Sequence, residues 1–132
     1  MKATGYLVVG LLLATFTING CATPPSEEQI SSLDHGAPPQ NYEAIIREYF
    51  DGVLFDPYSA HYDFEPPVQY WVKEAPLLGG GLYAGYLVRV GVNAKNRVGG
   101  YVGKQMYGFL LKDERIIKVL DEYDLQNMRI VK

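Results

Sequence analysis

The spacing of apolar residues divides the second half of the chain into one helix and a series of strands. Between residues 41 and 54 apolar residues recur at helical spacing, which predicts an amphipathic helix with one buried stripe. Asn41 precedes the stripe and is expected as the N-cap of this helix. The stripe consists of Tyr42, Ile45, Ile46, Tyr49, Phe50, Val53 and Leu54.

Alternation of apolar and polar residues follows the helix and predicts antiparallel strands separated by turn residues. A Glu65-Pro66-Pro67 break separates the first two strands, and a Lys112-Asp113-Glu114 turn separates the last two. We expect an α+β fold in which one amphipathic helix packs on a four- to five-stranded antiparallel meander sheet. The tail after residue 120 is expected to add a helical turn or a short strand. The strands are expected at residues 58–64, 68–74, 82–92, 97–111 and 115–120.

The stretch VNAKNRVGGYVG, residues 92–103, joins two of these strands and contains no acidic residue. Asn93-Ala94-Lys95-Asn96 is expected as a four-residue hairpin loop, because Asn tolerates positive φ. Gly99, Gly100 and Gly103 then fall inside the next strand, where glycine usually marks a bulge, a bend or a close approach. Two interpretations stay open: a strongly twisted structural hairpin, or a binding loop.

The first 20 residues are typical of an export signal. A positive start precedes the apolar run 6–16, which is too short to span a bilayer, since spanning takes roughly 20 residues. Ile18-Asn19-Gly20-Cys21 resembles a bacterial lipobox, and this resemblance implies that Cys21 is acylated and begins the mature protein. Two or more fatty chains anchor a protein stably on a membrane. The alternative is an ordinary secretory signal with an incidental cysteine.

The composition divides the chain into three parts. Residues 1–20 are the expected lipoprotein signal peptide, residues 21–40 a lipidated cysteine with a disordered tether, and residues 41–132 a small α+β domain. The tether is rich in proline and serine and has no aromatic residue, so it has little apolar surface to bury. Ala22 follows Cys21, a pattern that resembles lipoproteins sent to the outer membrane. We therefore expect a lipid anchor in the outer membrane and a domain that faces the periplasm.

Charge is distributed unevenly along the chain, whose formal net charge is −3. Residues 27–74 hold ten acidic and two basic residues, whereas residues 85–118 hold seven basic and two acidic residues. Basic side chains beside an aromatic ring and glycine backbone can bind the anionic groups of lipopolysaccharide, peptidoglycan or an envelope protein. The alternative is that the basic hairpin pairs with the acidic elements of its own domain. The candidate binding surface consists of Arg89, Lys95, Arg97, Tyr101 and Lys104.

No motif in the chain predicts catalysis or a cofactor. GGYVGKQ lacks the phosphate-binding spacing GxxxxGK[ST], and GxGxxG does not occur. Ser59, His61 and Asp63 have the residue types of a catalytic triad, but same-face neighbours on a strand stand about 6.8 Å apart with parallel side chains. Cys21 is the only cysteine, so neither a disulfide nor a dedicated zinc site is expected. We predict a protein that is not an enzyme and needs no metal or cofactor.

Two segments of the chain, DPYSA and VNAKNRVGGYVG, together with the lipobox-like ING-C, resemble a group of small proteobacterial envelope lipoproteins. The resemblance covers about the last two-thirds of the chain. It implies an envelope location and a shared fold, and it implies no activity. The residues that carry it are Asp56, Pro57, Ser59, Ala60, Asn93, Lys95, Asn96, Gly99, Gly100 and Tyr101.

These observations favour a non-enzymatic binding or structural module of the cell envelope, attached to the membrane through its lipid anchor. One alternative is an accessory component of an envelope secretion or assembly complex, in which an open sheet edge accepts a strand of another chain. A weaker alternative is a periplasmic inhibitor of lysozyme-type enzymes. Nucleic acid is not expected as a partner, given the compartment and the negative net charge.

Overall fold

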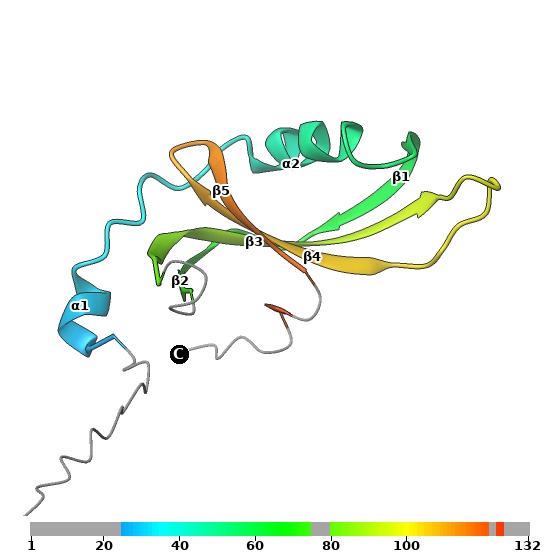
Figure 1. The fold of residues 1–132 in the computed structure, drawn as a ribbon. Helices are drawn as coiled ribbons and strands as arrows, with labels where there is room; N and C mark the ends of the chain where they lie inside the picture. Colours follow the sequence, from blue (N-terminus) through cyan, green and yellow to red (C-terminus); the bar gives the residue numbers. More distant parts are fainter. Residues whose placement is uncertain (1–24, 75–79, 122–123, 126–132) are drawn as a thin grey trace, which may run out of the picture.

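The computed structural model describes residues 25–74, 80–121 and 124–125. Its five strands form one antiparallel sheet, and a helix lies across one face of that sheet (Figure 1). This arrangement is the α+β fold that the sequence predicts. The elements are α1 (Glu27–Ser31), α2 (Tyr42–Asp51), β1 (Asp56–Phe64), β2 (Val68–Lys73), β3 (Leu82–Lys95), β4 (Gln105–Lys112) and β5 (Arg115–Leu120).

The central strand is β3, because β1, β2 and β4 all pair with it and β5 extends the sheet from β4. β2 pairs with residues 82–87 of β3 and β1 pairs with residues 90–95, so the two lie end to end along one edge. β1 and β2 therefore do not form a hairpin with each other, although they are consecutive in the sequence. Pro66 and Pro67 explain the break, because proline has no N–H to donate to a ladder.

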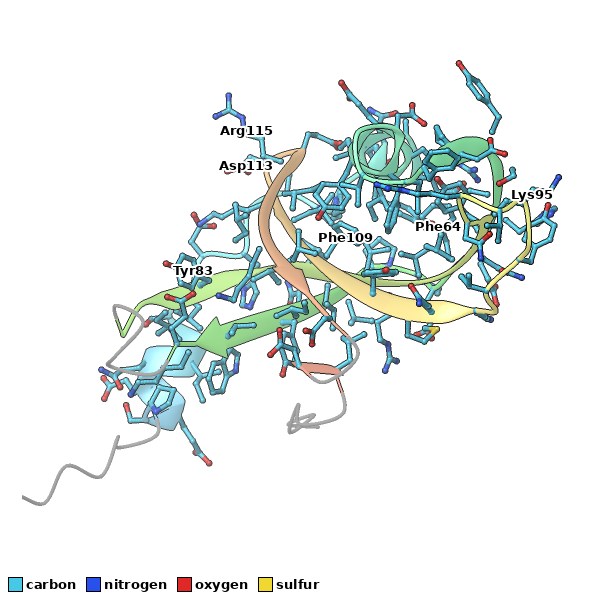
Figure 2. The ribbon with its side chains drawn as sticks, turned by 45° about the vertical axis from the view of Figure 1, so that its right-hand side comes forward. Phe64, Tyr83, Lys95, Phe109, Asp113 and Arg115 are labelled. Atoms are coloured by element: carbon cyan, nitrogen blue, oxygen red, sulfur yellow. The ribbon has the colours of Figure 1, made fainter. Side chains whose placement is uncertain are left out.

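The main core lies between α2 and the sheet, and Phe50 is at its centre. Phe50 is fully buried, and its ring meets those of Phe109 and Tyr107 edge-on, with centroid distances of 5.5 and 5.2 Å. Figure 2 shows Phe109 and Phe64 beneath the helix. Burial also raises the pKa of the Tyr62 hydroxyl, which belongs to this core. The sheet supplies Val88, Val90, Val92, Phe109 and Leu111 as further buried residues, on the faces that the alternation predicts.

A second, smaller core lies on the opposite face of the sheet. Leu87, Leu110 and Leu120 are buried there, one each from β3, β4 and β5. Partly buried side chains of β2, of the start of β3 and of the segment after β5 pack against them: Tyr70, Val72, Tyr83 and Leu125. At Leu87 and its neighbours β3 is consequently covered on both faces, which explains the apolar residue on its second face at this position.

The helix α2 ends three residues earlier than the apolar spacing predicts. Its last residue is Asp51, and Gly52 follows as the C-cap with its N–H directed at the Tyr49 carbonyl, 3.2 Å away. Glycine has a low helix propensity, which favours termination at this point. As a result Val53, counted in the predicted stripe, leaves the core and is 58% exposed.

A glutamate from a distant turn caps the N-terminus of α2. Asn41 occupies the predicted N-cap position, but its side chain makes no capping hydrogen bond. Instead the Glu114 carboxylate accepts hydrogen bonds from the backbone N–H groups of Gln40, at 2.7 Å, and Asn41, at 3.4 Å. A carboxylate at this end of a helix also interacts favourably with the helix dipole. Glu114 thus joins the β4–β5 turn to the start of α2.

The second half of the expected tether is attached to the domain, which differs from the disordered segment predicted for residues 21–40. The Lys112 ammonium donates to the Asp34 carbonyl at 2.8 Å and lies 3.0 Å from the Asp34 carboxylate. The Gly36 N–H and the Lys112 ammonium hold the pKa of the Asp34 carboxyl below its ordinary value. The first half contains α1, which has a capping box between Ser26 and Gln29 and buries no residue.

Several sequence predictions lie outside the described residues, including the export signal and Cys21. Of the tail, residues 124–125 form a helical turn in which the Leu125 N–H donates to the Asp121 carbonyl at 3.0 Å. Within the described part of the chain, no helix has the length and apolar character needed to cross a membrane.

The Glu114 contact predicts a measurable loss of stability. Glu114 and Asp113 both have positive φ, 60° and 50°, in the two-residue turn between β4 and β5. Glu114→Ala should lower the free energy of unfolding by about 1 kcal/mol, as expected for a lost helix cap. Asp113→Gly, in the same turn, should not lower it, because glycine favours this backbone conformation. Urea denaturation of both variants provides the measurement, and an equal loss in the two would contradict the capping role.

Candidate functional site

The candidate binding surface lies at one end of the sheet, where β3 and β4 join. The chain reverses at residues 96–100, where the Asn96 N–H donates to the Gly100 carbonyl at 2.9 Å and the Gly99 N–H to the Asn96 carbonyl at 3.0 Å. The predicted loop at Asn93–Asn96 is therefore displaced, since β3 continues to Lys95. Gly99 has a φ of 81° and lies in the turn instead of in a strand.

Two asparagine side chains stabilise this loop, which explains why the sequence has Asn at both positions. The Asn96 Oδ1 accepts hydrogen bonds from the backbone N–H groups of Val98, at 3.0 Å, and Gly100, at 3.1 Å. The Asn93 Oδ1 accepts one from the Gly103 N–H, at 3.1 Å. Asparagine here acts as a side-chain acceptor for the turn, and no positive φ is found at either position.

Tyr101 attaches the loop to β1. Its hydroxyl donates to the Ser59 carbonyl at 3.2 Å and lies 3.1 Å from the Nε2 of His61. The Lys95 ammonium lies over the Tyr101 ring, 5.6 Å from its centroid. Because β1 carries a register shift between Asp56 and His61, it bulges at this point and presents its carbonyl to the loop.

The possible triad residues are each engaged elsewhere. The Ser59 hydroxyl donates to the Asp56 carbonyl at 2.8 Å and accepts from the Lys95 N–H at 2.9 Å. His61 contacts Tyr101, and the Asp63 carboxylate forms a salt bridge with another residue, Lys104. In the described part of the chain, no group of three or more His, Cys, Asp or Glu side chains is placed to hold a metal ion.

The four cations among the candidate residues fall into two classes. Arg89 forms a salt bridge with Glu65, with 2.8 Å between Nε and Oε2, and Lys104 forms one with Asp63. Lys104 reaches Asp63 by lying directly over Gly91, where any side chain on β3 would block it. These two cations therefore match the alternative in which the basic hairpin pairs within its own domain. Both pairs are substantially exposed, so each contributes little to stability.

Lys95 and Arg97 belong to the other class, because neither forms a salt bridge within the described residues. Both lie beside aromatic rings: Lys95 over Tyr101, and Arg97 with its Cζ 5.9 Å from the centroid of the Phe55 ring. Figure 2 shows Lys95 at the far end of the sheet, away from Asp113 and Arg115. These cations keep their charge available for an anionic partner.

An open groove of about 260 Å³ adjoins these cations, between the segment after α2 and the β3–β4 hairpin. Apolar side chains form most of its lining. The residues that line it are Val53, Leu54, Phe55, Val92, Ala94, Lys95, Asn96, Val102, Gln105 and Tyr107.

Exposed apolar residues gather at this same end. Of the ten large hydrophobic side chains that are exposed in the described structure, six come from residues 53–58 and 98–102. Tyr58 is fully exposed and Val98 is 89% exposed. We call the set the hairpin-end surface; it consists of Val53, Phe55, Tyr58, Lys95, Arg97, Val98, Tyr101 and Val102.

Sequence reasoning missed the apolar part of this surface. The apolar spacing places Val53 in the buried stripe of the helix and places Phe55 in no element. The available signal is Gly52, which ends α2 and is followed by the exposed residues Val53 and Phe55. Comparison with protein-family models, with curated proteins and with solved structures finds no match to this chain.

The hydrogen bonds accepted by the Asn96 side chain predict how its substitution changes the stability and the amide hydrogen exchange of the loop. Asn96→Ala should lower the free energy of unfolding by about 1 kcal/mol and should speed amide hydrogen exchange at Val98 and Gly100, because both N–H groups lose their acceptor. Asn96→Asp retains the acceptor oxygen and should preserve most of the protection. Hydrogen exchange followed by NMR tests both, and unchanged exchange in the Ala variant would contradict the assignment.

Proposed function

We propose that this chain is a lipid-anchored protein of the outer membrane that faces the periplasm, and that its domain acts by binding through the hairpin-end surface. The proposal involves no catalysis, metal or cofactor. The lipobox-like sequence before Cys21 supports the anchor, and the resemblance to small envelope lipoproteins supports the location. The domain then provides a binding module close to the membrane.

One observation carries the binding proposal: two cations that form no salt bridge within the described residues stand next to a cluster of exposed apolar side chains. Single exposed apolar residues are common on proteins, but clusters of them usually mark interaction sites. Aromatic residues and Arg are also enriched where binding energy concentrates. The hairpin-end surface has both features, together with a groove that can admit a ligand group.

The pairing of Arg89 and Lys104 narrows the proposed binding residues to Lys95, Arg97 and Tyr101 with their apolar neighbours. Removal of a paired cation would leave a carboxylate of the domain without its salt bridge, whereas removal of Lys95 or Arg97 breaks no salt bridge within the described residues. The engaged positions of Ser59, His61 and Asp63 also support binding in preference to hydrolysis.

A second candidate function, membership of an envelope assembly complex, is favoured by the edge of the sheet at β5. Among residues 25–74, 80–121 and 124–125, β5 pairs with β4 on one side only, and its Ile117 and Val119 are each 36% exposed. The opposite edge is interrupted by Pro66-Pro67, and interruptions of that kind protect an edge from strand addition. If a partner adds a strand to this sheet, β5 is the position that accepts it.

The anchor is tested by Cys21→Ser. This variant should not incorporate labelled palmitate, because the thiol that carries the lipid is gone. It should be found either as an uncleaved precursor or as a cleaved protein in the soluble fraction. Fractionation of cells and mass spectrometry of the N-terminal peptide provide the measurement. Retention of the lipid mass in the variant, or its absence from the wild type, would contradict the anchor.

Binding is tested with a photoreactive benzoylphenylalanine placed in living cells at the position of Val98 or, as a control, of Arg115. Arg115 is also exposed but lies at the other end of the domain (Figure 2). Adducts with an envelope component should form at Val98 and not at Arg115. Lys95→Glu with Arg97→Glu should reduce them about fivefold, which corresponds to roughly 1 kcal/mol of lost attraction. Equal adducts at both positions would remove the hairpin-end surface from the proposal.

A further inference from the structure

We propose that the ligand of the hairpin-end surface is the surface of an anionic phospholipid bilayer, which the β3–β4 loop enters with its apolar side chains. This inference rests on the proposed function, since it names the partner of the same surface. It assigns the domain a second membrane contact in addition to the acyl chains on Cys21.

The composition of the surface matches the chemistry of a membrane interface. Phe55 and Val98 supply apolar groups that are 66% and 89% exposed, and Tyr58 and Tyr101 supply rings with a polar end. Aromatic residues of this kind are enriched where lipid headgroups meet the hydrocarbon layer. Apolar side chains that project among cations are also the pattern by which peripheral segments bind lipid surfaces.

The cations are placed where phosphate groups would lie. Lys95 and Arg97 each stand over an aromatic ring of the surface, so the charge lies next to the apolar groups. Asp56 stands opposite Lys95 in the pairing of β1 with β3 and offsets part of this charge. The surface is therefore weakly positive, and its apolar side chains must supply most of the attraction.

The shape of the loop favours a bilayer over a folded protein partner. The loop projects beyond α2 and the start of β1 (Figure 1). A Cβ atom added at Gly99 or Gly103 would meet no atom within 4 Å, so the tip is surrounded by solvent. A projecting apolar tip can enter a fluid layer without a matching concave surface, whereas a folded partner must provide one.

The proposed anchor would keep a bilayer within reach of the loop. Asp34, where the chain docks on the β4–β5 turn, lies thirteen positions after Cys21. An extended chain of that length spans at most about 45 Å. Tethering at such a distance gives the loop a high effective concentration at the bilayer surface, so even a weak contact between loop and lipid is populated. α1, which follows the proposed anchor, and the loop lie at opposite ends of the molecule, so a lipid contact of the loop is separate from that of the acyl chains (Figure 1).

The test uses the full chain reconstituted in vesicles of phosphatidylethanolamine and phosphatidylglycerol. Val98→Cys carries an environment-sensitive nitrobenzoxadiazole dye, and Arg115→Cys carries the same dye as a control. Nitroxide-labelled lipids should quench the dye at Val98 severalfold more strongly than the dye at Arg115. Adding Phe55→Asp to the Val98→Cys variant should remove most of this quenching. Val68→Asp, which places the same charge at an exposed apolar residue outside the surface, should not.

The outcomes separate the inference from the proposed function. Quenching restricted to Val98 supports the bilayer as ligand. Equal, weak quenching at both positions in protein whose Cys21 carries the lipid mass overturns it and leaves the anchored binding module intact. If Cys21 lacks the lipid mass, the dye variants are combined with Cys21→Ser and mixed with vesicles. Quenching at Val98 then supports the bilayer contact without the anchor. Absence of quenching at Val98 overturns the bilayer contact as well as the anchor. A protein adduct at Val98 without quenching identifies a protein partner.

Discussion

The length of β3 relative to α2 is the constraint on which the rest of the structure depends. A strand of 14 residues runs about 46 Å, whereas a helix of ten residues is about 15 Å long. One short helix therefore covers only part of the sheet. The middle of β3 is buried on both faces and receives strands on both edges. Its last residues pair with the start of β1 and lead into the β3–β4 loop, which projects beyond the helix (Figure 1). The hairpin-end surface exists because nothing else in the described domain is placed to cover that projection.

Local patterns in the sequence were sufficient for the parts of the fold that depend on local contacts. The faces of β3, the Lys112–Glu114 turn and the start of α2 follow from side-chain period and turn chemistry within a few residues. Contacts between distant residues were not accessible in this way. Glu114 caps a helix that begins more than 70 residues earlier, and Asp34 docks on Lys112 across a similar separation. The end-to-end arrangement of β1 and β2 also depends on pairing with β3, although Pro66-Pro67 indicated that a break would occur there.

The candidate site shows the same division. In the sequence Lys95, Arg97 and Tyr101 are close together, and the structure places them at the end of the sheet where β3 and β4 join. Charge alone does not show which cations form salt bridges. The salt bridges of Arg89 and Lys104 depend on the register of β1 against β3 and on that of β3 against β4. The turn was displaced for a related reason. Asn93 and Asn96 have the chemistry of turn residues, but here that chemistry is side-chain acceptance, and Gly99 supplies the positive φ.

The fold accounts for some residues of the hairpin end and leaves others to be explained by contact outside the domain. Asn96, Tyr101 and Ser59 make hydrogen bonds that hold the loop, so the stability of the fold is a sufficient reason for these residues. Val98 and Tyr58 differ, because they are almost entirely exposed and a polar residue would cost the fold little at either position. Apolar groups held in water at a projecting tip reduce solubility and bring no stability in return. A partner that removes them from water gives these residues a physical role, and a bilayer near the proposed anchor is the partner whose chemistry matches their arrangement.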